Sequence, residues 1–247
     1  MSQPSLRPQK TALLLAQRIV GDIHQRGNRA GDRLPPERVM LEEYSVGRGT
    51  LRESLRFLEL QGVISLRPGP GGGPVVQQPR ASNLAHSLTL LLQFEHASFR
   101  TVVEARGTLE PVMAQLAAQR MSDEQIVELG RSVETREEQP GDEGAVRQQD
   151  RQFHGAIAHG SGNAALGCLV DALLETLHGS ATGVDLPDTH RSAVDDAHRA
   201  IYASIAARDP ARSAAAMRDH LAAHLEHAER TFPDVLDAPV TWFLGTT

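Results

Sequence analysis

Four residues in the C-terminal half of the chain have the types and spacing of a metal site. Asp150 and His154 stand four positions apart in Asp-Arg-Gln-Phe-His, so on a helix their side chains project from one face, one turn apart. His198 and His220 fall at matching levels of two later helical segments. One carboxylate oxygen and three imidazole nitrogens suit a divalent metal and leave coordination positions open for water or a ligand.

The spacing alone leaves a second interpretation open. His224 lies one helical turn beyond His220, and His227 lies a further step along, so one segment carries three histidines. A helix with several histidines more often presents them to solvent than to a metal. Both a metal site and a solvated histidine face are therefore compatible with these positions.

Helices must position these side chains, because strand signals disappear after Asn83. From there the chain shows roughly seven amphipathic segments with apolar residues at helical spacing. One of them begins with Asp209 as an N-cap acceptor ahead of Pro210, a favourable first helical residue. We predict an all-α antiparallel helical bundle over residues 83–231, followed by a C-terminal tail at 232–247.

The segment from Gly47 to Leu58 has the pattern of a DNA-recognition helix. At 100° per residue its leucines form one apolar stripe, and its arginines follow the adjoining side. The leucines are Leu51, Leu55 and Leu58, and the arginines are Arg48, Arg52 and Arg56. One face can pack on the protein while the next meets DNA, although a solvated run of charge gives the same pattern.

The elements around this segment indicate a winged helix. An apolar helical pattern over 12–24 and a second helix opened by Pro36 precede the arginine-bearing segment. Two short β-prone runs, at 63–66 and 75–76, flank a loop rich in glycine and proline and predict a hairpin, the wing. We therefore expect a mainly α protein whose N-terminal winged helix-turn-helix, an α+β domain at residues 8–78, precedes the bundle.

Charge separates the two halves of the chain. Residues 1–80 hold 12 Lys and Arg against 7 Asp and Glu, whereas residues 81–247 hold 13 against 24. The basic part suits the phosphate backbone of a nucleic acid, and the acidic part is repelled from it.

The single cysteine, Cys168, excludes an intrachain disulfide. Without an apolar run long enough for a bilayer or a signal sequence, the protein is expected to be cytoplasmic, with no membrane partner.

The span 13–76 resembles the winged-helix domain of the GntR family of bacterial transcription regulators. The family pattern consists of Leu-Pro-(Ser/Pro)-Glu-Arg, then Val-x-Arg-x-x-(Val/Leu)-Arg-Glu-(Ala/Ser)-Leu, then Leu-x-x-x-Gly. Matching segments stand here at 34–38, 46–55 and 58–62. The resemblance implies that three arginines contact DNA and that a threonine is available for a phosphate or base contact. These residues are Arg38, Arg48, Arg52 and Thr50.

The chain departs from that family pattern in two places. Gly47 stands where a serine N-cap is common, which weakens the start of the recognition helix slightly. The wing tip lacks a histidine or aromatic residue, so Arg67 is the nearest candidate for a minor-groove contact. Arg56 lies further from the helix N-terminus, where base edges are read, and is either a phosphate contact or solvated.

The span 88–227 resembles the all-helical FCD effector domain of the FadR branch of the same family. The shared motifs are Arg-x-x-x-Glu at 106–110, Asp-x-x-Phe-His at 150–154, Gly-Asn at 162–163, His-x-x-Ile at 198–201 and His-Leu at 220–221. The resemblance implies that Asp150, His154, His198 and His220 bind a divalent metal. His224 and His227 are then expected on the surface. Zn, Ni, Mn and Fe all accept imidazole with carboxylate, so the ligand set leaves the metal's identity open.

In such domains small carboxylates coordinate the metal or lie beside it. Arg106 is expected to point into the same cavity and to hold an effector carboxylate with its planar guanidinium. Asn163 is assigned with it as an effector-binding residue. The alternative for Arg106 is an ion pair with Glu110, one turn further on.

Together these features predict a homodimeric transcription regulator. The resemblance to the family implies that it is a repressor. Its affinity for a double-stranded DNA operator would be set by a small organic acid bound at or near the metal. Two recognition helices would enter successive major grooves of a pseudo-palindromic site. One alternative is a regulator that responds to the metal alone. Another is a metal-dependent hydrolase in which the metal activates water. The hydrolase leaves the DNA-binding module unexplained, so we predict that the protein is not an enzyme.

Overall fold

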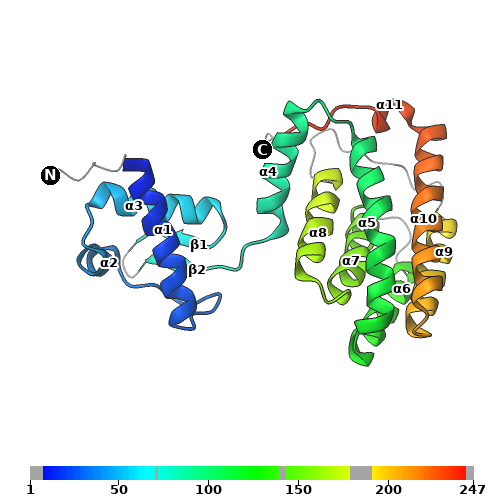
Figure 1. Ribbon diagram of the computed structural model, residues 1–247, viewed down its shortest axis with the longest axis horizontal. Coiled ribbons are helices and arrows are strands. Elements are labelled where there is room, and N and C mark those ends of the chain that lie inside the picture. Colours follow the sequence, from blue (N-terminus) through cyan, green and yellow to red (C-terminus); the bar gives the residue numbers. More distant parts are fainter. Residues whose placement is uncertain (1–7, 70–71, 139–142, 179–190, 243–247) are drawn as a thin grey trace. The chain divides into compact units, whose positions relative to one another are not determined.

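The computed structural model describes residues 8–69, 72–138, 143–178 and 191–242 (Figure 1). Its contacts divide the chain into two compact units, with the division between Asn83 and Leu84. We call them the first unit and the second unit.

The first unit is a winged helix-turn-helix, as predicted. Its helices and strands are α1 (Pro8–Gln25), α2 (Glu37–Tyr44), α3 (Arg48–Leu60), β1 (Ile64–Arg67) and β2 (Gly73–Val76). The two strands pair antiparallel, with Ile64 opposite Val76 and Arg67 opposite Gly73. A short hairpin therefore follows α3 directly, which is the position of a wing.

The leucine stripe of α3 forms much of the core of the first unit. Leu51, Leu55 and Leu58 are each 2% exposed or less, and they pack in one cluster with Ile19 of α1 and Met40 of α2. Burying three leucine side chains contributes roughly 5–9 kcal/mol before conformational entropy is subtracted. This burial fixes the rotation of α3, so its arginine side has to face outward.

The second unit is an all-α bundle arranged around one long central helix. Its helices are α4 (Ala81–Phe94), α5 (Phe99–Arg120), α6 (Asp123–Glu138), α7 (Glu143–Gly160), α8 (Ala164–His178), α9 (Arg191–Ala206), α10 (Pro210–Thr231) and the short α11 (Pro233–Leu236). Helix α5 contacts α7, α8, α9 and α10, and it lies alongside α10 over much of its length (Figure 1). The predicted cap is present, since the Asp209 side chain accepts a hydrogen bond from the backbone N–H of Arg212 at 3.0 Å.

Small residues let the central helix approach its neighbours closely. Ala114, Ala117 and Ala118 of α5 are fully buried in one cluster with Met217 and Leu221 of α10. Beyond this apolar layer α5 also buries Arg106 and Glu110, the two charged residues of the Arg-x-x-x-Glu motif, and Glu110 contacts His154 of α7. A buried charge is costly unless it is paired, so this polar layer in the core calls for a specific explanation.

The segment predicted as a tail is packed against the second unit over residues 232–242, so that prediction is corrected. Leu236 and Val240 are at most 2% exposed and join the cluster around Phe99 of α5. The backbone N–H of Phe99 donates to the carbonyl of Ala238 at 3.1 Å. The segment shows no helical period because most of it is too irregular to have one, although its apolar residues fill the core. Residues 243–247 lie outside the described part of the chain.

Candidate metal centre

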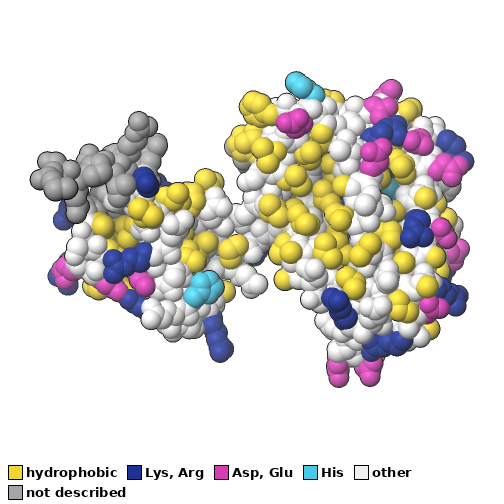
Figure 2. Space-filling model, in the orientation of Figure 1, with side chains coloured by type: hydrophobic (Ala, Val, Ile, Leu, Met, Phe, Trp, Pro, Cys, Tyr) yellow, Lys and Arg dark blue, Asp and Glu magenta, His cyan; other side chains and the backbone are white. Residues whose placement is uncertain are grey.

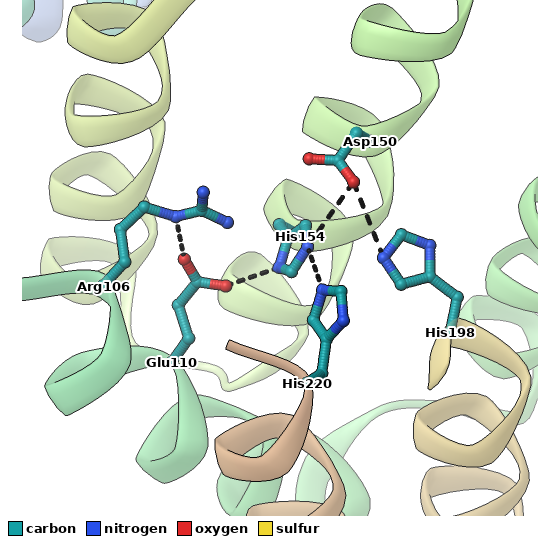
Figure 3. A network of polar contacts seen from close by, with 6 residues as sticks. All are labelled: Arg106, Glu110, Asp150, His154, His198 and His220. Carbon is teal, nitrogen blue, oxygen red and sulfur yellow. Dashed lines mark hydrogen bonds and ion pairs between the residues drawn. The ribbon is translucent and has the colours of Figure 1, made fainter. Parts of the chain in front are cut away.

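Three helices bring the four predicted ligands to one place in the core of the second unit. Asp150 and His154 lie one turn apart on α7, His198 lies on α9 and His220 on α10 (Figure 3). Each of the three histidines offers a nitrogen, and these nitrogens lie within 4.8 Å of one another. The structure therefore brings together all four residues of the predicted set.

The separations within this group fit the coordination sphere of one small cation. Nε2 of His220 lies 3.4 Å from Nε2 of His154. Oδ1 of Asp150 lies 3.8 Å from Nε2 of His154 and 3.6 Å from Nε2 of His198. Ligand atoms held about 2.0–2.2 Å from a metal stand about 3–4 Å apart, in either tetrahedral or octahedral geometry. The three separations fall in this range, so the residues fit a divalent transition metal.

Packing holds the imidazoles in place. His154 and His198 are at most 1% exposed, and His220 is 7% exposed. The ring of His198 stacks on Phe153, with centroids 4.0 Å apart and an interplanar angle of 16°. Phe153 precedes His154 in the chain, so one turn of α7 supplies two of the candidate ligands and the surface that supports a third.

Burial also keeps His220 uncharged. Desolvation, followed by the neighbouring His154, lowers the pKa of His220 to about 3. A neutral imidazole presents a lone pair, which is the form that binds a metal. The electrostatics of the pocket therefore favour the ligating form of this side chain at neutral pH.

A buried chain of charge lies beside the ligands, on α5. Nε of Arg106 donates to Oε1 of Glu110 at 2.5 Å, and Oε2 of Glu110 lies 2.5 Å from Nδ1 of His154 (Figure 3). Burial by itself would raise the pKa of Glu110, but the charge of Arg106 and the hydrogen bonds with His154 and Arg106 outweigh it and lower this pKa to about 2. Glu110 is therefore an ionised carboxylate in the core. Its contact with a predicted ligand did not follow from the sequence pattern.

The ion pair between Arg106 and Glu110 is the alternative that the sequence left open. It does not use the whole guanidinium, because Nη2 of Arg106 is buried and has no hydrogen-bond partner among the described residues. In Figure 3 the remaining nitrogens of Arg106 lie on the side of Asp150 and His154. Arg106 thus keeps a buried donor near the candidate metal centre while it is paired with Glu110.

Two other residues are placed differently from what was expected. His224 was expected on the surface, yet it is only partly exposed, and burial followed by Arg106 lowers its pKa to about 4. The sequence signal for this partly buried placement was the position of His224 one helical turn after His220. Asn163 is exposed, and its Oδ1 accepts hydrogen bonds from the backbone N–H groups of Ala165 and Leu166. Asn163 therefore caps α8, and we do not retain it as an effector ligand.

The residues predicted to contact DNA lie on the surface of the first unit. Arg48 and Arg52, both on α3, are exposed, as are Arg38 on α2 and Arg67 at the end of β1, while Thr50 is partly exposed. Nε of Arg52 lies 3.3 Å from Oε2 of Glu37, and both side chains are open to solvent. Such a pair is weak, so Arg52 can exchange it for a phosphate or a base.

None of the helices in the described part of the chain is both long enough and apolar enough to cross a membrane.

Two family models match the chain, one in each unit. The model for bacterial regulatory proteins of the gntR family matches residues 11–72, and the FCD domain model matches residues 101–223. The second match includes all four candidate ligands together with Arg106 and Glu110.

Relatives and a solved structure agree with these matches. The chain is 30% identical over 212 residues to Rv0494, an HTH-type transcriptional regulator of Mycobacterium tuberculosis, covering 83% of this chain and 84% of that one. It is 25% identical over 223 residues to the HTH-type transcriptional repressor NanR of Cronobacter sakazakii, with coverages of 87% and 84%. The structure of a GntR protein from Streptococcus agalactiae matches with a TM-score of 0.67 and 26% identity, covering 89% of this chain and all of that one.

These similar proteins and both models are those of transcription regulators and not of enzymes, which removes the hydrolase alternative. The chain is a DNA-binding regulator that belongs to the GntR family of bacterial transcription regulators and joins the family's winged helix to an FCD domain.

Proposed function

We propose that this regulator is a homodimeric repressor whose second unit binds a divalent metal and, beside it, a small organic acid that controls operator binding. The observation that carries the proposal is the convergence of Asp150 and three buried histidines next to Arg106. The name of the NanR relative supports the repressor assignment.

The charges of the site favour a bound cation together with an anion. Glu110 already neutralises Arg106, and Asp150 faces the imidazoles of His154 and His198. A divalent metal adds positive charge to this group, and its open coordination positions accept carboxylate oxygens when it is bound. Zn, Ni, Mn and Fe all suit these ligands, so the proposal covers a divalent transition metal as a class.

Arg106 gives the proposed effector its second point of attachment. A buried donor without a partner is costly, and a carboxylate oxygen at Nη2 of Arg106 would satisfy it. An acid that reaches both the metal and Arg106 would be held at two points and oriented. Its effect on DNA binding then depends on its relative affinity for the DNA-competent and the DNA-incompetent arrangement of the dimer.

A thermal-shift screen of small organic acids, run on metal-loaded and on chelator-treated protein, tests the proposal. A ligand at a hundred times its dissociation constant adds about 2.7 kcal/mol, which raises the melting temperature of a unit of this size by about 5–11 °C. We expect chelation to lower the melting temperature and acids to stabilise only the metal-loaded form. Stabilisation by metal with no effect of any acid would favour the metal-responsive regulator. No effect of metal or of acids would refute the proposed site.

Helix α4 offers the surface on which a second copy would dock. Its fourteen residues include no Asp, Glu, Lys or Arg, yet Leu84, Leu91 and Phe94 are 42%, 66% and 78% exposed. Their spacing of i, i+7 and i+10 places them on one stripe of the helix, and Figure 2 shows hydrophobic side chains gathered over α4. A two-fold axis brings a surface against itself, and an uncharged stripe meets its own copy without like-charge repulsion.

We expect Leu91→Asp to convert the dimer to a monomer at micromolar concentration, because two carboxylates would face each other across the axis. Size-exclusion chromatography with light scattering measures this change directly. Val127→Asp is the matched control, since Val127 is 51% exposed on α6 among charged neighbours. A Leu91→Asp protein that stays dimeric would contradict the assignment of this surface.

A further inference from the structure

Glu110 makes two short contacts whose combination assigns it a role. We propose that Glu110 is a positioning residue, which fixes His154 with Nε2 toward the metal and joins that ligand to Arg106. The inference rests on the metal site of the proposed function and adds to it a residue outside the ligand set. Glu110, Arg106 and His154 are all at most 5% exposed, so solvent cannot replace these contacts.

The contact with His154 determines which nitrogen of the ring carries the proton. Oε1 of Glu110 is already paired with the guanidinium of Arg106, so Oε2 is left as an acceptor, and Nδ1 of His154, 2.5 Å from it, is the donor. In a neutral ring the lone pair then lies on Nε2. That atom is the one that faces His220 at 3.4 Å and Asp150 at 3.8 Å. Glu110 therefore selects the tautomer that a metal at this centre requires.

Each oxygen of Glu110 has a separate partner, and this fixes the direction of the carboxylate. Oε1 accepts from Nε of Arg106, one turn earlier on α5, while Oε2 accepts from the ring on α7. Glutamine replaces one of these two oxygens with an NH₂ donor, so it cannot present an acceptor to Arg106 at one position and to His154 at the other. Aspartate is one methylene shorter and cannot span both partners from the same backbone position.

The same carboxylate also orients Arg106. Because Glu110 uses Nε, the Nη side of the guanidinium stays available, and Nη2 is the buried atom without a hydrogen-bond partner among the described residues. A metal that draws on the lone pair of His154 strengthens the donation from Nδ1 to Glu110. The candidate ligand His154 and the proposed anion-binding residue Arg106 are thus connected through the side chain of Glu110. By thermodynamic linkage, any effect of the metal on anion affinity is matched by an equal effect of the anion on metal affinity.

The inference is tested by measuring the metal affinity of the full chain with the substitution Glu110→Gln. The probe is Zn²⁺ alone, and the protein competes for it with a chromophoric chelator. Loss of a carboxylate behind a ligating histidine weakens metal binding about 10- to 100-fold, and we expect this loss here. Glu229→Gln is the matched control. Glu229 also pairs with an arginine of α5, Arg100, but contacts none of the ligands in the described structure. Its Zn²⁺ affinity should stay within about twofold of the wild type, and unchanged affinity in Glu110→Gln would overturn the inference.

The tautomer of His154 in the metal-free protein gives a second, independent measurement. Nitrogen-15 NMR of histidine-labelled protein at pH 8, above the ordinary histidine pKa, distinguishes protonation on Nδ1 from protonation on Nε2. The signal is assigned by its loss in His154→Gln. We expect the Nδ1–H form in the wild type, and the Nε2–H form would overturn the inference. If the wild type bound no Zn²⁺, the proposed metal centre would fail, while this measurement would still decide the role of Glu110.

Discussion

Arg48→Ala and Arg52→Ala are each expected to abolish operator binding at protein concentrations that saturate the wild type. An arginine that reads a base in the major groove contributes about 1–3 kcal/mol, and a two-fold symmetric dimer makes each contact twice. The expected loss is therefore about 2–6 kcal/mol, or roughly 30-fold to 10⁴-fold in affinity. Both side chains are exposed on α3, and the buried leucine stripe that fixes this helix is untouched.

Fluorescence anisotropy with an operator selected by the wild-type protein from random DNA measures this loss. Arg218→Ala is the matched control, because it removes one exposed arginine from α10 of the second unit. Circular dichroism should show the same helix content in all variants. Wild-type affinity in either α3 variant would contradict the assignment of α3 as the recognition helix.

The salt dependence of the same measurement separates the two kinds of contact. A lost phosphate contact reduces the slope of log affinity against log salt by about one for each contact, or about two for a dimer. A lost base contact reduces affinity and leaves the slope nearly unchanged. The pair that Arg52 makes with Glu37 is exposed to solvent and offsets little of either loss.

Much of the fold could be predicted because local signals and burial agree in this chain. Leucines at positions 51, 55 and 58 fall on one face of a helix, and the structure buries all three. Two β-prone runs around a glycine-rich loop formed the wing. In the second unit the one-turn spacing of Asp150 and His154 is fixed by the helix itself, so their adjacency did not depend on tertiary packing.

The remaining features depend on contacts between distant segments, which spacing cannot show. Glu110 and His154 are 44 residues apart, and only the packing of α5 against α7 makes them partners. The C-terminal segment has no helical period, yet it places Leu236 and Val240 in the core. His224 was expected on the surface because the resemblance assigned all four ligand positions to other residues. In the structure it is partly buried, and Arg106 of α5 and Asp150 of α7 act on its charge.

The second large effect is expected from His220→Ala, which should remove stoichiometric metal binding. Structural zinc sites with four protein ligands are worth about 10–16 kcal/mol, so one ligand accounts for about 3 kcal/mol, a hundredfold or more in affinity. His220 is the proposed ligand from α10, and its Nε2 lies 3.4 Å from Nε2 of His154 on α7. Zn²⁺ retained after gel filtration, measured by elemental analysis, gives the result directly.

His227→Ala is the control for this variant, since it removes a histidine from the same helix. His227 is partly exposed, and its Nδ1 lies 3.4 Å from the hydroxyl of Thr231, so we expect full metal content in its absence. His220→Gln keeps most of the side-chain volume and separates the loss of a ligand from the loss of packing. Because the metal would connect α7, α9 and α10, chelation should no longer lower the melting temperature of either His220 variant. A His220→Ala protein that keeps its metal would show that the remaining three residues, or another set, form the site.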